Sequence, residues 1–363
     1  MNAILRKAAL LMSLQVTALG ALAAGQNKGN SKPSAPAPAP TELVWPGPPE
    51  QPRIRFIAAI TTFEDVTGRR RLSFAERMAG KSPMRERLAL KKPYGVAVDR
   101  LARVFVADAA QKAIVIFDRN TKSATLWKGN GQFPLALPVA LAFSDDGRLF
   151  VSDSFAGQIV VFEPTGKPIA AFGKSTLGRP GGLAVDSARK RLYVADAKFN
   201  QVSVFSTENY SSQQTIGRAA KPTDLGAGAL SGPSNVALDS KGNLFVTDTF
   251  NCRIQVFDPA GSVLRVFGTQ GVRPGNFVRP KGIALDSEDH VYVVDAAFNN
   301  LQVFTTEGKP LLVVGSGGDQ PGQFMLPAGL ATDREDRVYV TEQRILDGRL
   351  QVFQYLREPS SKP

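Results

Sequence analysis

Residues 280–304 have the sequence PKGIALDSEDHVYVVDAAFNNLQVF, and this arrangement of residue types occurs six times in the chain. Each copy opens with a run of the general form Pro-x-Gly-apolar-Ala-apolar-Asp, and the copies begin at Pro93, Pro138, Pro180, Pro233, Pro280 and Pro327. An aromatic-led apolar run that ends in an acidic residue follows, and a third apolar run ends in phenylalanine every time. The chain is therefore built from six tandem units.

The length of the unit indicates the architecture. Successive units start 45, 42, 53, 47 and 47 residues apart, and a period of about 40–50 residues that carries several short strands is typical of β-propeller blades. Runs such as Val104–Ala107 are apolar at consecutive positions, as expected for strands that are covered on both faces. We predict an all-β fold, in which residues 93–356 form a six-bladed β-propeller of four-stranded blades.

The units resemble the NHL repeat, both in the stretch quoted above and in residues 232–258, GPSNVALDSKGNLFVTDTFNCRIQVFD. The resemblance covers residues 93–353 and implies that the Pro-x-Gly run is the innermost strand of each blade. The aromatic run would then be the second strand, the run ending in Phe the third, and the segment before the next Pro the outer fourth. The resemblance is specific for fold and says little about function.

The sixth unit has no outer strand of its own. Only ten residues follow Phe353, and two of them are prolines. The strand-like segment Arg53–Ile60 lies outside every unit. We predict that residues 53–61 pair with the third strand of blade six and close the ring, which removes exposed sheet edges.

The N-terminal residues have the features of a secretory signal. Arg6 and Lys7 precede an apolar stretch, and small residues follow it at 21–23. This order predicts a signal peptide over residues 1–23 and a periplasmic or extracellular protein, an exported bacterial-type NHL-repeat protein by the resemblance. Residues 24–52 are rich in Pro and Ala and predict a disordered tether, with docking of Leu43–Trp45 on the domain as the alternative. Residues 357–363 are interpreted as a C-terminal tail.

Residues 62–92 form the most basic stretch of the mature chain and include Arg69–Arg71. Apolar residues between Leu72 and Ala79 have rough helical spacing, so we predict a basic, partly helical insert across the propeller. The alternative is a solvated loop without a role. The formal net charge of +12 for the whole chain favours acidic partners.

The binding site is expected on the face that carries the loops between blades and those joining second to third strands. Four basic residues flank the Pro-x-Gly starts, and no acidic residue does. The ligand-binding candidates on this face are Lys92, Tyr94, Arg179, Arg279, Lys281, Phe199, Phe250, Phe298 and Asn251. In the alternative interpretation, the basic side chains pair with second-strand acids such as Asp196 and Asp295, which would cancel their field.

The sequence gives little support for a catalytic or metal site. The acids that end the second strands recur once per blade at Asp108, Asp153, Asp196, Asp248, Asp295 and Glu342. We interpret them as turn-capping groups. The chain has one Cys and one His, so neither a Cys/His metal set nor a Cys-His nucleophile pair can be assembled. His290 lies in a polar turn, where we expect an exposed imidazole without a role.

Two functions remain as hypotheses. The favoured one is an exported, non-enzymatic propeller scaffold without a cofactor or metal, which binds a protein, peptide or anionic polymer through its basic face. Nucleic acid is disfavoured as a partner because of the predicted export. The alternative is a metal-dependent hydrolase or lyase with an axial divalent ion held by oxygen ligands, since such ligands can come from distant blades.

Overall fold

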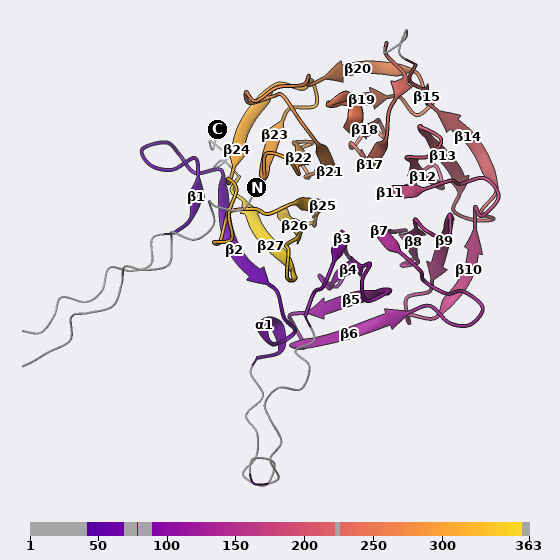
Figure 1. The fold of residues 1–363 in the computed structure, drawn as a ribbon, viewed down its shortest axis with the longest axis horizontal. Helices are drawn as coiled ribbons and strands as arrows, with labels where there is room; N and C mark the ends of the chain where they lie inside the picture. Colours follow the sequence, from indigo (N-terminus) through magenta and orange to yellow (C-terminus); the bar gives the residue numbers. More distant parts are fainter. Residues whose placement is uncertain (1–41, 69–77, 79–88, 222–225, 358–363) are drawn as a thin grey trace, which may run out of the picture. The chain divides into compact units, whose positions relative to one another are not determined.

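A computed structural model describes residues 42–68, 78, 89–221 and 226–357. They form six antiparallel sheets around a central axis, a six-bladed β-propeller (Figure 1). The predicted fold class is confirmed. The short α-helix α1 covers Glu64–Thr67, and a 3-10 turn covers Thr249–Asn251.

Each of the first five blades consists of four consecutive strands in simple up-and-down order. Blade one contains β3 (Pro93–Val98), β4 (Val104–Asp108), β5 (Ala113–Asp118) and β6 (Ser123–Lys128). Blade two contains β7 (Pro138–Phe143), β8 (Leu149–Asp153), β9 (Gln158–Phe162) and β10 (Pro168–Phe172). Blade three contains β11 (Pro180–Asp186), β12 (Arg191–Asp196), β13 (Gln201–Ser206) and β14 (Ser212–Ile216).

Blade four contains β17 (Pro233–Leu238), β18 (Leu244–Asp248), β19 (Arg253–Phe257) and β20 (Val263–Phe267). Blade five contains β21 (Pro280–Leu285), β22 (Val291–Asp295), β23 (Asn300–Phe304) and β24 (Pro310–Val314). The longer spacing between the third and fourth units accommodates a small parallel pair, β15 (Arg218–Ala219) with β16 (Ala229–Leu230). In Figure 1 the strand that opens each unit lies nearest the axis and the fourth strand lies at the rim.

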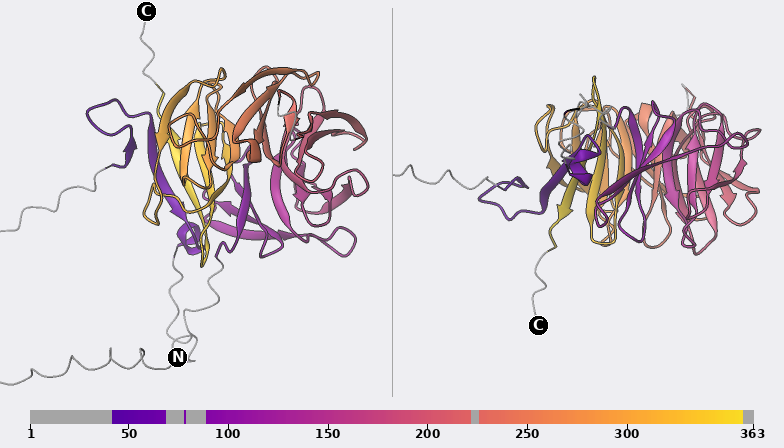
Figure 2. Two further views of the ribbon diagram at one scale, coloured as in Figure 1. Left: turned by 45° about the horizontal axis from the view of Figure 1, so that its top comes forward. Right: turned by 90° about the horizontal axis from the view of Figure 1, so that it is seen from below.

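Blade six is completed by the N-terminal part of the domain. Its own strands are β25 (Pro327–Thr332), β26 (Arg337–Gln343) and β27 (Gly348–Tyr355), and β2 (Ile54–Ile60) pairs antiparallel with β27 as the fourth strand. This is the ring closure that the sequence predicted. Figure 2 shows β2 beside the blade-six strands from two further directions.

A fifth strand was not predicted. β1 (Val44–Trp45) pairs with the outer edge of β2, and the Trp45 ring lies 5.8 Å from the Phe353 ring. The segment interpreted as a disordered tether, residues 24–52, is therefore too long at its C-terminal end, where the alternative of docking is correct. The apolar indole explains the docking, because it finds a buried partner in blade six.

The core lies between neighbouring blades. Six apolar clusters fill the interfaces, and the second and third strands contribute most of their residues. These strands are buried along nearly their whole length, as their consecutive apolar residues predicted. The thiol of Cys252 is also buried and donates to the carbonyl of Val278 at 3.2 Å. Burial raises the pKa of this thiol, which keeps it protonated and unreactive.

Several predicted segments fall outside the described residues. These are the signal peptide over 1–23, most of the predicted tether, most of the basic insert, and most of the tail. Within the described part, the insert begins with α1, and Thr62 forms an isolated bridge with Ala89. No helix of the described residues is long and apolar enough to cross a membrane.

Candidate functional site

The loops between blades and the hairpins between second and third strands lie on the same face of the ring. Backbone hydrogen bonds join them in every blade, for example from Ala197 N–H to the Arg179 carbonyl at 3.1 Å and from Ala296 N–H to the Arg279 carbonyl at 3.0 Å. We call this side the mouth face. The hairpins between first and second strands, with His290 in blade five, lie at the other end of these strands.

A cavity of about 400 Å³ opens on the mouth face, where the innermost strands begin. Three of the predicted basic residues line it, and they are Arg179, Arg279 and Lys281. Arg179 and Arg279 immediately precede β11 and β21, so the start of each strand fixes their position on the rim. Lys281 is the second residue of β21 and lies deeper, since it is only partly exposed. The fold thus brings together residues that are 100 positions apart in the sequence.

The acidic residues of this face are already occupied by backbone groups. Asp196 accepts hydrogen bonds from the backbone N–H groups of Gly178 and Arg179 at 2.7 and 3.0 Å. Asp295 accepts them from Val278 and Arg279 at 2.7 and 3.2 Å. The turn-capping role is confirmed, because each carboxylate also accepts from the hairpin that follows its own strand. Each acid therefore ties the loop before its blade to a hairpin within the blade.

The arginine side chains do not share in these bonds. No carboxylate of the described residues forms an ion pair with Lys92, Arg179, Arg279 or Lys281. The direct pairing with second-strand acids that the alternative interpretation expected is thus not found in the described part of the chain.

The pKa of Lys281 is lowered by its surroundings at the mouth. Burial of the ammonium group lowers the pKa, and the positive charges of Arg279, Arg179 and Lys92 lower it further. Lys92 does not line the cavity, but it is close enough to act on Lys281. A partly desolvated ammonium group among like charges is stabilised when an anion approaches.

The other predicted site residues divide into two groups. Tyr94 and Phe250 line the cavity with the basic side chains, and the Phe250 side chain is 75% exposed. Phe199 is exposed outside the cavity, and Phe298 is half-buried. Asn251 donates its amide to Asp248 at 2.9 Å, so this side chain supports the blade, and the geometry does not bring it to the cavity.

Exposed apolar side chains surround the mouth at other blades. Phe155 in blade two is 83% exposed, and Ile345 and Leu346 at the tip of the β26–β27 hairpin are 85% and 96% exposed. Sequence reasoning missed the Ile-Leu pair. Its signal was present, since the corresponding hairpins of blades three to five have a Phe-Asn pair at their tips. The mouth face therefore combines positive charge with isolated apolar anchors.

The possible metal ligands of the structure are dispersed. Within the described residues, no group of three or more His, Cys, Asp and Glu side chains is arranged to hold a metal ion. His290 is neither exposed nor idle, contrary to our expectation. Its Nδ1 lies 3.0 Å from an oxygen of Asp286, and its ring is 5.1 Å from that of Tyr355.

Comparison with known proteins supports the fold. A family model described as "6-bladed beta-propeller" matches residues 229–299, and among curated proteins no sequence matches the chain. Virginiamycin B lyase from Staphylococcus aureus is similar in structure, with 16% identity, a TM-score of 0.53, and coverage of 73% of this chain and 96% of the lyase. A protein of unknown function from Bacteroides thetaiotaomicron has 17% identity and a TM-score of 0.59, with 74% and 71% covered.

A chain in a nidogen/laminin complex is also similar, with 17% identity and a TM-score of 0.55, over 68% of this chain and 86% of that one. All three identities are low, so each likeness concerns the fold alone. An enzyme and a partner in a protein complex thus share this architecture, and function must be argued from the site. The described chain is a six-bladed β-propeller whose mouth face carries unpaired positive charge.

Proposed function

We propose that this protein is a non-enzymatic propeller scaffold that binds an anionic ligand, either an acidic protein or peptide or an anionic polymer, at its mouth face. One observation carries the proposal. Arg179, Arg279 and Lys281 converge on one cavity, and the carboxylates nearest to them in the blades are engaged with backbone N–H groups. An anionic ligand could pair with these basic side chains.

The exposed apolar side chains support a binding role. Phe250 lies at the cavity itself, and large exposed side chains at blades two and six extend the surface outward. Aromatic and arginine side chains together are typical of protein recognition surfaces.

The similarity to the lyase does not favour an enzyme here. A solved structure of that lyase is a catalytically inactive variant in which a histidine is replaced by alanine. The present chain has a single histidine, and His290 is not among the residues that line the mouth cavity. We therefore do not propose the metal-dependent hydrolase or lyase.

We also propose that the propeller is of the NHL type and that it acts outside the cytoplasm after removal of residues 1–23. The basic and apolar order of the leader supports export, and the six units described above support the repeat type. Intact mass of the purified exported protein tests the cleavage. A mass that includes residues 1–23 would contradict it.

Charge reversal tests the binding face. The variant has Lys92, Arg179, Arg279 and Lys281 changed to Glu, and we expect it to lose salt-sensitive retention on an anionic matrix at low ionic strength. A control with the same net charge reverses exposed lysines elsewhere, namely Lys122, Lys167, Lys241 and Lys309. The control should keep most of the retention, because clustering and not total charge creates the site.

Two outcomes would contradict the proposal. The first is equal loss of retention in both variants, which would mean that net charge alone is responsible. The second is loss only when Arg69–Arg71 are reversed, which would move the binding surface to the basic insert. Lys281→Met gives a finer check, since it should weaken retention without lowering the melting temperature, because a desolvated charge is removed.

A further inference from the structure

The grooves between neighbouring blades are sealed at the rim of the ring. In each of the first four grooves, a side chain of the outer strand fills the space beside the turn between the third and fourth strands of the next blade. The pairs are Trp127 with Gly166, Phe172 with Tyr210, Gln214 with Gly261, and Phe267 with Gly308. A Cβ atom added to Gly166 or Gly308 would collide with the facing aromatic ring. These side chains therefore close the grooves beside the turn.

The groove between blades five and six differs because of how the ring closes. Its outer strand β24 has Leu312 and Val314 in the same register positions that Arg265 and Phe267 occupy in β20. Arg265 spans its own groove and donates to the Thr306 carbonyl at 2.7 Å. A leucine cannot do so. Blade six also has no turn between its third and fourth strands, since β2 comes from the other end of the domain.

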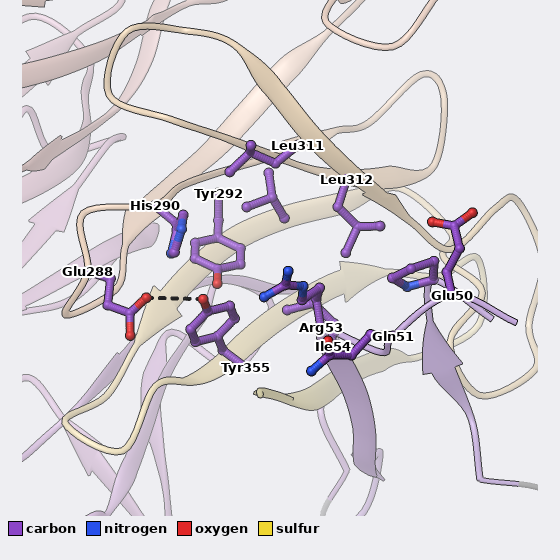
Figure 3. A pocket seen from close by; sticks show the side chains of 12 residues that line it. Glu50, Gln51, Arg53, Ile54, Glu288, His290, Tyr292, Leu311, Leu312 and Tyr355 are labelled. Carbon is purple, nitrogen blue, oxygen red and sulfur yellow. Dashed lines mark hydrogen bonds between the residues drawn. The ribbon is translucent and has the colours of Figure 1, made fainter. Parts of the chain in front are cut away.

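A cavity of about 710 Å³ results at this groove. Its volume falls within the range of about 300–1,000 Å³ that is typical of small-molecule sites. Ile54, Val303, Leu311 and Leu312 give it apolar walls (Figure 3). Tyr292 and Tyr355 lie close to one another on one side. The cavity is thus apolar in its middle and aromatic at one end.

Acidic side chains stand at both ends of the cavity. Figure 3 shows Glu288 at the aromatic end and Glu50 at the opposite end. Glu288 accepts the hydroxyl of Tyr355 at 3.1 Å through one oxygen, and its other oxygen lies 3.7 Å from Arg357. Asp286 lies behind His290 and accepts from both His290 and Tyr292. Arg53 and His290 are the basic residues on the wall.

Carboxylates act on both titratable rings at the aromatic end. The hydrogen bond to Asp286 raises the pKa of His290, and the charges of Asp286, Glu288 and Asp336 act in the same direction. Burial raises the pKa of Tyr355 to about 12, with the neighbouring carboxylates adding to the effect and Arg53 opposing it. A positive group placed beside Glu288 is therefore stabilised by that carboxylate.

We propose that this lateral cavity binds an organic cation, a molecule with an apolar or aromatic body and a protonated or quaternary amine. The body packs on Leu311, Leu312 and Ile54, and the amine lies near Glu288 against the Tyr355 ring. Aromatic rings attract such cations through their faces. The site is separate from the mouth face, so it does not depend on the function proposed above.

Isothermal titration of the full chain with benzyltrimethylammonium tests the proposal. Glu288→Gln keeps an acceptor for Tyr355 and removes the charge, and it should weaken binding about fivefold, as expected for a partly exposed charge pair. Arg53→Gln should tighten binding by a similar factor. The control Glu163→Gln removes a half-buried carboxylate in blade two, far along the ring, and should leave binding unchanged.

Filling of the cavity gives a second test. Leu312→Arg introduces the residue that occupies the corresponding position of blade four and should abolish binding, with a melting temperature near that of the wild type. Tighter binding of benzenesulfonate than of the cation would show that the cavity does not prefer a cation. Weaker binding of the cation by the Arg53→Gln protein would show the same. Full binding by a folded Leu312→Arg protein would overturn its location.

Discussion

Replacing Ile54 by alanine should weaken the closure of the ring. Ile54 is 1% exposed and packs with Phe353 and Val338 in the cluster between blades five and six. The change removes three carbon groups at about 0.8 kcal/mol each, and the cavity left behind adds to this loss. We expect a free energy of unfolding about 3 kcal/mol lower, which corresponds to a melting temperature about 6 °C lower for a domain of this size.

The same strand provides the control. Ile57 is 37% exposed and lies at the irregularity in the pairing of β2 with β27. Ile57→Ala should therefore change the free energy of unfolding by only about 0.5 kcal/mol, as surface substitutions do. Both variants keep the backbone pairing of β2, so the difference between them measures side-chain burial at the seam.

The two tryptophans of the chain allow the seam to be observed separately. Trp45 is paired opposite Ile54 and reports on the closure, whereas Trp127 lies in β6 against Phe162 and reports on blades one and two. In single-tryptophan proteins, Ile54→Ala should shift the guanidinium transition of Trp45 at least as far as that of Trp127. Equal midpoints for Ile54→Ala and Ile57→Ala would refute the claim that β2 is an essential part of blade six.

Three further predictions concern other parts of the fold. The charged imidazole of His290 contributes stability through its bond to Asp286, which raises its pKa; this contribution is complete below about pH 6.5 and is lost as the pH rises through the raised pKa. The melting temperature of wild type relative to His290→Asn should therefore fall between pH 6 and pH 9. Arg349→Met leaves Glu342 buried without its ion pair and should cost about 3–5 kcal/mol in denaturant unfolding. Gly182→Ala would place a Cβ atom against the backbone of the next blade and should lower the free energy of unfolding by at least about 1–3 kcal/mol.

Matched control variants test these three predictions. Asparagine occupies the position in blade four that corresponds to His290, and it donates to its own hairpin aspartate at 2.7 Å, so His290→Asn should fold normally. A constant difference across the pH range would show that the imidazole is not charged in the folded protein. Arg349→Met combined with Glu342→Gln should recover part of the lost stability, and no recovery would mean that packing explains the loss. Gly131 has no atom within 4 Å of an added Cβ, so Gly131→Ala should be neutral.

The repeat made the ring and the turn-capping acids of its blades predictable. Each unit carries its own strand boundaries, and Asp196 and Asp295 occur at one position of that unit, so their turn contacts follow from local sequence. Closure by β2 also followed, because blade six lacked a strand and one unused strand-like segment was available.

The finer features of the sites depended on contacts between blades. The basic residues of the mouth were visible in the sequence, but whether Arg279 paired with Asp295 depended on which groups the carboxylate accepted. The lateral cavity arises from a missing turn and from Leu312 in place of an arginine. Neither feature predicts a cavity until the path of β2 beside blade six is known. The docking of Trp45 likewise depends on a ring that another blade supplies.

Ring closure also sets an order of events during biosynthesis. The residues of β2 leave the ribosome early, but their partner strand β27 is about 300 residues further along the chain. Five blades can form while β2 waits unpaired, and an unpaired strand is a template for aggregation. Nascent chains that end before Gly348 should therefore be sensitive to proteolysis near residues 54–60 even when their earlier blades are folded. Protection of that segment marks the moment at which the molecule is complete.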